Sequence, residues 1–214
     1  MIDFSNTKAL TIPEGSVVKI EKITGELVWT KPTEEPAINF LEYLENTTNA
    51  NCVKTGIKPT QNTRLTVEVE ALDTTQYKGI AGSRDSSYSF CFFTNTSTWR
   101  ADYYQKQSVS SYTIAVGQKI KLTLDGSGFY INDVQYDDYG TVNFQVSQDI
   151  WLLGVNNRGS KMNAMNQKFY TAQIHESSVL VRDYRPAVDP NGTTCMYESV
   201  ERKYYYFDGT NVPA

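Results

Sequence analysis

The sequence lacks a long apolar run, a concentration of basic charge and a closely spaced pair of cysteines. No stretch approaches the ~20 apolar residues that a membrane-spanning helix needs, which excludes a protein with such helices. The 20 Lys and Arg residues are slightly outnumbered by 24 Asp and Glu, which gives a formal net charge of −4 and a pI near 5.1. Proteins that bind nucleic acids or anionic membranes normally carry a concentrated basic patch, so neither partner is expected.

The sequence is also poor in cysteine and histidine, which has consequences for zinc sites and for disulfides. Cys52, Cys91 and Cys195 are far apart and have no CxxC spacing, which argues against zinc. Their odd number prevents complete disulfide pairing, and their apolar neighbours predict buried, unreactive thiols. His175 is the single histidine, so a metal site or catalytic triad that needs histidine has one candidate position. The opening residues MIDFSNTKAL do not resemble a signal peptide, and we expect synthesis in a reducing cytosol.

Strand patterns dominate what is present. Residues 64–71, RLTVEVEA, place Leu65, Val67 and Val69 on one face and charged or polar residues on the other, as a strand with one dry face requires. Residues 119–124, KIKLTL, alternate in the same way with Ile120, Leu122 and Leu124. Further strands are expected at 89–94, 99–105, 129–132, 141–146, 150–155, 168–175, 180–184, 194–198 and 203–207. No window shows a helical stripe longer than two turns. The sequence therefore predicts an all-β protein, an antiparallel two-sheet sandwich.

The chain is long enough for one domain of sandwich size and a small additional element. Residues 1–32 contain short strand candidates separated by Pro13-Glu14-Gly15 and Thr24-Gly25, which predicts a small β-hairpin module. A piece of this size is marginally stable alone and needs a partner surface. Residues 33–39, which continue the Pro- and Glu-rich stretch that begins at Lys31, are expected to form a semi-rigid linker. The sandwich domain is placed at 40–214.

Several motifs between residues 40 and 208 follow an order typical of one family. The two most specific are VRDYRP at 181–186 and MYESV at 196–200. Weaker ones are LEYLE at 41–45, TGIKP at 55–59, NTR at 62–64, GSR at 82–84 and FYIND at 129–133. With this set the chain resembles the concanavalin-like, laminin-G-like jelly-roll (lectin) domains that are frequent in tailed-bacteriophage structural proteins and bacterial surface proteins. One departure is Asp133, which stands where the hairpin of the family has Gly.

The resemblance extends to the first 32 residues, where ALTIPEG and GELVW are similar to a short module of phage tail and baseplate proteins. It implies a virion structural protein of the tail tip, baseplate or fibre, assembled in the host cytoplasm. The N-terminal module would attach to other virion proteins, and the jelly roll would bind a host-surface glycan. The family analogy further implies a homo-oligomer, for which we expect a trimer. Neither enzymatic activity nor a cofactor is expected. The alternatives are a ligand-free structural or decoration module of the virion and, further removed, a glycoside hydrolase.

An aromatic and polar run at residues 95–104 supplies the candidate glycan site. Sugars stack on aromatic rings while their hydroxyl groups pair with charged side chains. The predicted glycan-binding residues are Arg84, Trp99, Arg100, Asp102 and Tyr103. They come together if strands 89–93 and 99–104 form a hairpin. Alternation requires half of the aromatic residues to face the core, so ordinary sandwich packing is the alternative interpretation.

Glu68, Glu70 and Asp73 are the residues that raise the more distant alternative, a glycoside hydrolase. Some jelly-roll glucanases carry carboxylates with approximately this spacing on one strand, where two of them lie ~5–5.5 Å apart and act as nucleophile and acid. Alternation already explains Glu68 and Glu70 as the wet face of a half-buried strand, so no catalytic residue is expected.

A calcium site is a second alternative, because some laminin-G-like domains bind Ca²⁺ and oxygen-rich loops suit that ion. The chain has no Asp-x-Asp-x-Asp-Gly loop, and no metal site is expected. The acidic residues that raise the alternative are Asp133, Asp137, Asp138 and Asp149.

Overall fold

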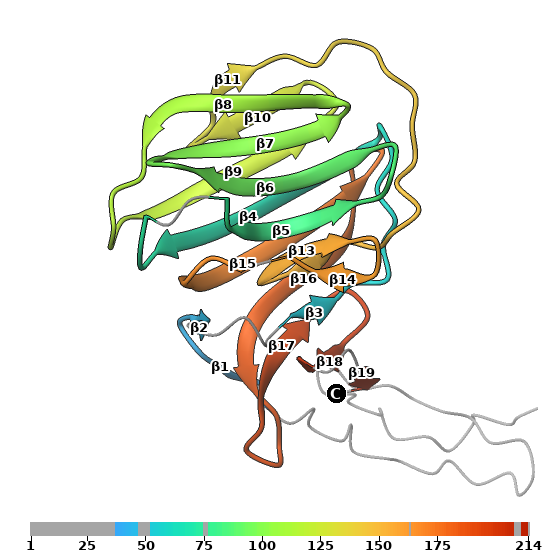
Figure 1. Ribbon diagram of the computed structural model, residues 1–214. Helices are drawn as coiled ribbons and strands as arrows, with labels where there is room; N and C mark the ends of the chain where they lie inside the picture. The colour runs from blue at the N-terminus through green and yellow to red at the C-terminus, as the bar shows by residue number, and fades with distance from the viewer. Residues whose placement is uncertain (1–36, 47–51, 75–76, 163, 208–210, 214) are drawn as a thin grey trace, which may run out of the picture. The chain divides into compact units, whose positions relative to one another are not determined.

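The computed structural model describes residues 37–46, 52–74, 77–162, 164–207 and 211–213. From residue 38 onward these residues belong to one unit, Ile38–Ala214. They form strands, turns and loops (Figure 1). Within them there is no helix long and apolar enough to cross a membrane. The predicted hairpin module at 1–32, and linker residues 33–36, lie outside the described residues.

The described strands form two sheets, which are packed face to face. In the eleven-stranded sheet the order is β11-β10-β9-β4-β15-β16-β17-β18-β19, with β1 paired to β16 and β2 to β15. Its strands are β1 (Asn39–Phe40), β2 (Leu44–Asn46), β4 (Thr63–Ala71), β9 (Lys119–Asp125), β10 (Gly128–Ile131), β11 (Val134–Asp137), β15 (Gln167–Glu176), β16 (Val179–Val188), β17 (Thr194–Glu198), β18 (Lys203–Tyr205) and β19 (Asn211–Pro213).

In the eight-stranded sheet the order is β14-β13-β5-β6-β7-β8, and β12 pairs with both β3 and β5. Its strands are β3 (Val53–Lys54), β5 (Gly79–Arg84), β6 (Ser89–Asn95), β7 (Thr98–Tyr104), β8 (Lys106–Thr113), β12 (Trp151–Leu152), β13 (Gly154–Asn157) and β14 (Ser160–Lys161). The described strand pairs are antiparallel except for the β13–β5 pair, which is parallel. This architecture confirms the predicted all-β two-sheet sandwich and is consistent with a jelly roll.

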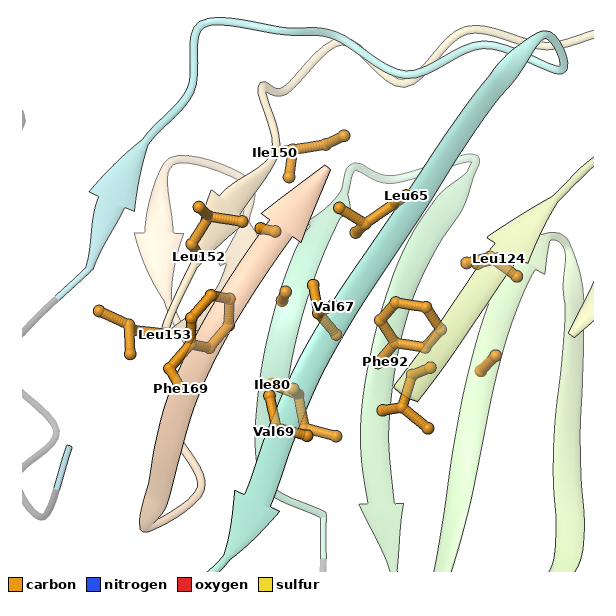
Figure 2. Packing of buried hydrophobic residues seen from close by; sticks show 14 of the residues in the cluster. Leu65, Val67, Val69, Ile80, Phe92, Leu124, Ile150, Leu152, Leu153 and Phe169 are labelled. Atoms are coloured by element: carbon orange, nitrogen blue, oxygen red, sulfur yellow. The ribbon is translucent and has the colours of Figure 1, made fainter. Parts of the chain in front are cut away.

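The core lies between the two sheets, where strand alternation directs one face of each sheet inward. The six interior residues predicted from the sequence are all at most 2% exposed: Leu65, Val67, Val69, Ile120, Leu122 and Leu124. Figure 2 shows the β4 residues of this set facing Ile80 and Phe92 of the other sheet, with Phe169 of β15 beside them. Each fully buried Leu, Ile, Val or Phe contributes about 1.5–3 kcal/mol relative to exposure, so this layer dominates the stability of the sandwich.

The strand predicted at 141–146 is wrong, although the burial pattern behind it is real. This segment belongs to the long connection from β11 to β12, which runs down one side of the sandwich in Figure 1. Phe144 and Val146 are buried between exposed neighbours. Their N–H groups donate to Gln61 Oε1 at 3.2 Å and to the Pro59 carbonyl oxygen at 2.9 Å. Alternation therefore predicted which side chains face inward, but the backbone bonds to a loop instead of to a strand.

Other strands differ from prediction in length or were missed. The strand expected at 150–155 is divided into β12 and β13 at Leu153, which has a φ of +63°. The sequence pattern did not reveal β5, β8 or β11. In β5 the first five residues are all buried, so no alternation marks the strand. The three cysteines are free and buried, as predicted.

Candidate functional site

The β6–β7 hairpin that the predicted glycan site requires is present, with Asn95 paired to Thr98 at its tip. Alternation along β7 nevertheless separates the five predicted residues into two sets. Trp99 and Tyr103 face the core and are 1% and 0% exposed. Arg84, Arg100 and Asp102 belong to the opposite, outer face of the eight-stranded sheet, described below.

Trp99 and Tyr103 are therefore wrong as sugar-stacking residues. The ring of Tyr103 stacks on Tyr139 with centroids 4.4 Å apart and meets Phe144 edge-on at 5.0 Å. Its hydroxyl donates to the Gln61 carbonyl oxygen at 3.3 Å. The ring is fully buried in the sandwich core, and this burial raises the pKa of Tyr103 to about 12. These two aromatics have the packing role that the alternative interpretation gave them.

On the outer face of the sheet, Arg100 and Asp102 of β7 form an ion pair. Arg100 donates from Nε to Asp102 Oδ1 at 2.6 Å and from Nη2 to Asp102 Oδ2 at 2.7 Å. Residues two apart on a strand share a face, which is why both side chains meet here. Burial by itself would lower the pKa of Arg100, but the hydrogen bonds and charge of Asp102 outweigh it and raise that pKa. Asp102 is thus committed to Arg100.

A small apolar floor lies beside this pair. Cys91 and Phe93 of β6 pack with Val155 of β13, and Met162 joins them. The Arg100 guanidinium lies over the Phe93 ring, 5.6 Å from its centroid. Burial raises the pKa of the Cys91 thiol well above its ordinary value, so this thiol stays neutral. The floor therefore offers an uncharged surface between arginine side chains.

Tyr77 forms the rim of this floor and was missed by the sequence analysis. Its side chain is 54% exposed, and its φ of +54° is unusual for a bulky residue. Its N–H donates to the Thr94 carbonyl oxygen at 3.1 Å, which fixes the segment against β6. A hollow of about 180 Å³ is lined by Tyr77, Arg84, Phe93, Arg100 and Met162. No periodic pattern around residue 77 could have indicated it.

A second hollow, of about 290 Å³, shares Arg84 with the first. Its lining is polar and includes serines 86, 87 and 89, Arg158, Asp102 and Gln107. Tyr88 and Tyr104 also line it and stack on each other with centroids 5.2 Å apart. We call the two hollows together the Arg84 cleft. It has an exposed tyrosine, arginines and hydroxyl groups, which are the groups that bind saccharides.

Asp85 holds one wall of the Arg84 cleft in shape. Its Oδ1 accepts the N–H groups of Ser87 and Tyr88, both at 2.8 Å, and its Oδ2 accepts that of Ser147 at 2.7 Å. Burial tends to raise the pKa of Asp85, but these N–H donors bring it below its ordinary value. The carboxylate is thus ionised and fully used in ordering the turn, so it is not free for a ligand.

A third hollow, of about 500 Å³, lies on the outer face of the eleven-stranded sheet and was also not predicted. Phe40, 47% exposed, lies at this hollow with Tyr170. The Arg185 guanidinium is 5.9 Å from the Phe40 centroid, and Lys119 Nζ is 4.3 Å from that of Tyr170. The cations here cover the rings, which leaves less aromatic surface for a sugar than at Tyr77.

The three carboxylates considered as catalytic residues each bind another side chain of the protein. Glu68 pairs with Lys119 at 2.8 Å, and Glu70 pairs with Lys168 at 2.9 Å and accepts the Tyr170 hydroxyl at 2.7 Å. The hydrogen bonds from Tyr170 and Lys168 lower the pKa of Glu70. A general acid in glycoside hydrolysis needs the opposite shift. Asp73, the third member of the run, accepts a hydrogen bond from Asn166 at 2.6 Å.

The acidic loops of the calcium alternative are likewise hydrogen-bonded to protein groups. Asp133 pairs with Lys121, Asp137 with Lys106, and Asp149 accepts from the Trp151 indole. Within the part of the chain that the structure describes, no three His, Cys, Asp or Glu side chains are grouped as a metal site would need.

Comparison with known proteins adds no assignment. No protein-family model matches the chain, and no curated protein matches it either. The functional argument therefore depends on the geometry of the Arg84 cleft and on the sequence motifs.

Proposed function

We propose that the protein is a structural component of a tailed-phage virion, in the tail tip, baseplate or fibre, whose jelly-roll domain attaches to a host-surface glycan. The resemblance of its motifs to those of phage jelly-roll domains supports the virion part. The observation that carries the binding part is the exposed Tyr77 ring beside the two arginines of the Arg84 cleft. Aromatic faces and charged donors are the two requirements of sugar recognition.

The proposed binding residues are revised from the sequence prediction. Arg84 and Arg100 remain, Asp102 acts through Arg100, and Tyr77 takes the stacking role expected of Trp99. A shallow site of this size binds one or two sugar units weakly, and adhesion gains strength from many copies on one particle. Attachment to the virion is assigned to residues 1–32, and the oligomer is proposed to be a trimer by family analogy.

Binding of the purified full chain to an array of bacterial surface polysaccharides tests the proposal. We expect the double variant Tyr77→Ala with Arg84→Ala to lose at least about tenfold in binding, which corresponds to ~1.4 kcal/mol. The matched control is Phe40→Ala with Arg185→Ala, which also removes one aromatic and one arginine, but from the other sheet. Thermal unfolding of each variant confirms that it is folded.

Two results would contradict the binding proposal. Equal binding by the Tyr77/Arg84 variant and the wild type would remove the cleft from consideration. If the wild-type chain binds no polysaccharide, the ligand-free structural or decoration module becomes the better explanation.

The virion assignment has its own test in the gene neighbourhood. We expect genes for a tail tape-measure protein and for lysis proteins to flank this one. A neighbourhood without virion genes would contradict the assignment and leave the binding proposal to be judged by the array.

A further inference from the structure

Arg84 lines both hollows of the cleft and forms no ion pair within the part of the chain that the structure describes. Its Nε atom is buried and has no hydrogen-bond partner among the described residues. Arg100, on the same face, has both an ion pair and two hydrogen bonds to Asp102. The buried Nε is out of reach of a ligand, but Arg84 is only partly buried and lines both hollows, so the other N–H groups of its guanidinium can meet an acceptor that a ligand supplies.

Arg158 brings a second cation to the same hollow. Its backbone N–H donates to the Arg84 carbonyl oxygen at 3.0 Å, and its φ of +55° belongs to the tight turn that follows β13. Its side chain is exposed and has no ion-pair partner within the described ranges. Arg84 and Arg158 therefore border one polar hollow of about 290 Å³.

The other charged groups around the hollow are already satisfied. Asp85 accepts three backbone N–H groups, and Asp102 is paired with Arg100. Lys106 pairs with Asp137 at 2.6 Å and donates to the Asp138 carbonyl oxygen at 2.9 Å. After the ion pairs are formed, the charges of Arg84 and Arg158 face the single carboxylate charge of Asp85, so positive charge exceeds negative charge around the hollow. Such an arrangement complements an anion.

We infer that the Arg84 cleft binds an acidic saccharide, through a carboxylate or phosphate oxyanion held by Arg84 and Arg158. This inference rests on the proposed glycan-binding function and names the ligand class for the same site. Guanidinium groups match planar carboxylates and phosphates with paired hydrogen bonds. The serine hydroxyls of the hollow are available for sugar hydroxyls, and the exposed ring of Tyr77 lies beyond Arg84 for an adjacent sugar unit.

The two sources of the oxyanion are a uronic acid and a phosphodiester-linked polyol or sugar. The test uses the full chain with three probes: oligogalacturonate, poly(glycerol phosphate) and neutral dextran. We expect one acidic probe to bind and dextran not to bind, and the acidic probe that binds identifies the source. Raising NaCl from about 0.05 M to about 0.5 M should weaken binding about tenfold, because partly exposed charges are screened.

Charge variants separate the arginine contribution from general folding. Arg84→Gln and Arg158→Gln should each lose about tenfold in affinity. Arg84→Lys should retain part of the affinity, because the charge remains but the paired donors are lost. Arg185→Gln is the matched control on the other sheet and should bind like the wild type.

The possible results separate an error in the ligand class from an error in the proposed glycan-binding function. If dextran binds as well as the acidic probes and Arg84→Gln has no effect, the ligand is a neutral saccharide and the inference is wrong, while glycan binding stands. If no probe binds and the polysaccharide array is also empty, both the inference and the proposed binding function are wrong. Binding to the array through neutral glycans alone also overturns the inference.

Discussion

Gly82 is the residue that allows β5 to lie against β6 beneath the Arg84 cleft. Its φ is +122°, and an added Cβ would lie 2.3 Å from the Phe90 carbonyl oxygen and 2.4 Å from the Cys91 Cα. Both obstacles are backbone or close to it, so they cannot rotate away. Glycine is therefore required here for two reasons, conformation and space.

We predict that Gly82→Ala lowers the free energy of unfolding by about 3 kcal/mol or more, because backbone strain and overpacking add. Gly117→Ala is the matched control. Gly117 also has a positive φ, of +82°, but nothing lies within 4 Å of its added Cβ, so about 1 kcal/mol is expected. Denaturant titration of both variants measures the difference. Equal losses at the two positions would show that the close approach of β5 to β6 contributes little.

The candidate site shows which of its residues can be predicted from the sequence and which cannot. Arg84, Arg100 and Asp102 were predicted because charged side chains form hydrogen bonds with sugar hydroxyls, and the structure places all three on the outer face of the eight-stranded sheet. Trp99 and Tyr103 were chosen because aromatic rings stack on sugars. They lie on the same face of β7 as Ala101, and this face is buried in the core. The sequence pattern alone does not show which of the two faces of this strand is turned toward the core. Tyr77 lies outside any strand, so its exposure follows from tertiary context alone.

At the scale of elements, the β4–β15 pair places the single histidine opposite an arginine. His175 of β15 lies across from Arg64 of β4. Burial and the positive charge of Arg64 lower the pKa of His175, and Asp183 opposes them more weakly. The unfolded chain therefore takes up a proton near pH 6.5 that the folded chain takes up only at lower pH.

The sign of the resulting pH dependence follows from this difference. Because the folded pKa is the lower one, the contribution to stability is present above pH 6.5 and decreases as the pH falls toward the folded pKa. We predict that the free energy of unfolding decreases between about pH 7.5 and 5.5 and that His175→Gln flattens this slope. Chemical denaturation at several pH values measures it.

Glu176 provides the control for the same pair of strands. Burial raises the pKa of Glu176, so its contribution has the opposite sign and is lost as the pH rises from its ordinary value near 4.5. Glu176→Gln should therefore leave the slope around pH 6.5 in place. A slope that survives in His175→Gln would assign the pH dependence to another group.

Single elements also show that hydrophobic alternation in the sequence and strand pairing in the structure do not always coincide. In residues 64–71 and 119–124, alternation and pairing coincide, because β4 and β9 are neighbours in one sheet. In residues 141–146 the same alternation occurs without a neighbouring strand. Burial of every second residue is a property of one segment, whereas a strand needs a partner whose position depends on the whole fold. The sequence predicts the first and not the second.

At the scale of the molecule, the two sheets and their core all lie within the unit Ile38–Ala214. The first described strand, β1, already pairs with β16 of the eleven-stranded sheet. The sandwich therefore includes residues from about position 39 onward. Residues 1–32 were assigned a different task, attachment to other virion proteins and assembly of the oligomer. Folding and assembly are therefore proposed to be separable.

We predict that a fragment beginning at Ile38 unfolds in one cooperative transition at nearly the temperature of the full chain, because the core is retained. In light scattering the same fragment should be monomeric, whereas the full chain should be oligomeric. Fusing residues 1–37 to a monomeric reporter supplies the reciprocal control and should transfer the oligomeric state. A fragment that keeps both the oligomeric state and incorporation into the virion would place the assembly surface on the sandwich itself, and the attachment role of the first 32 residues would be wrong.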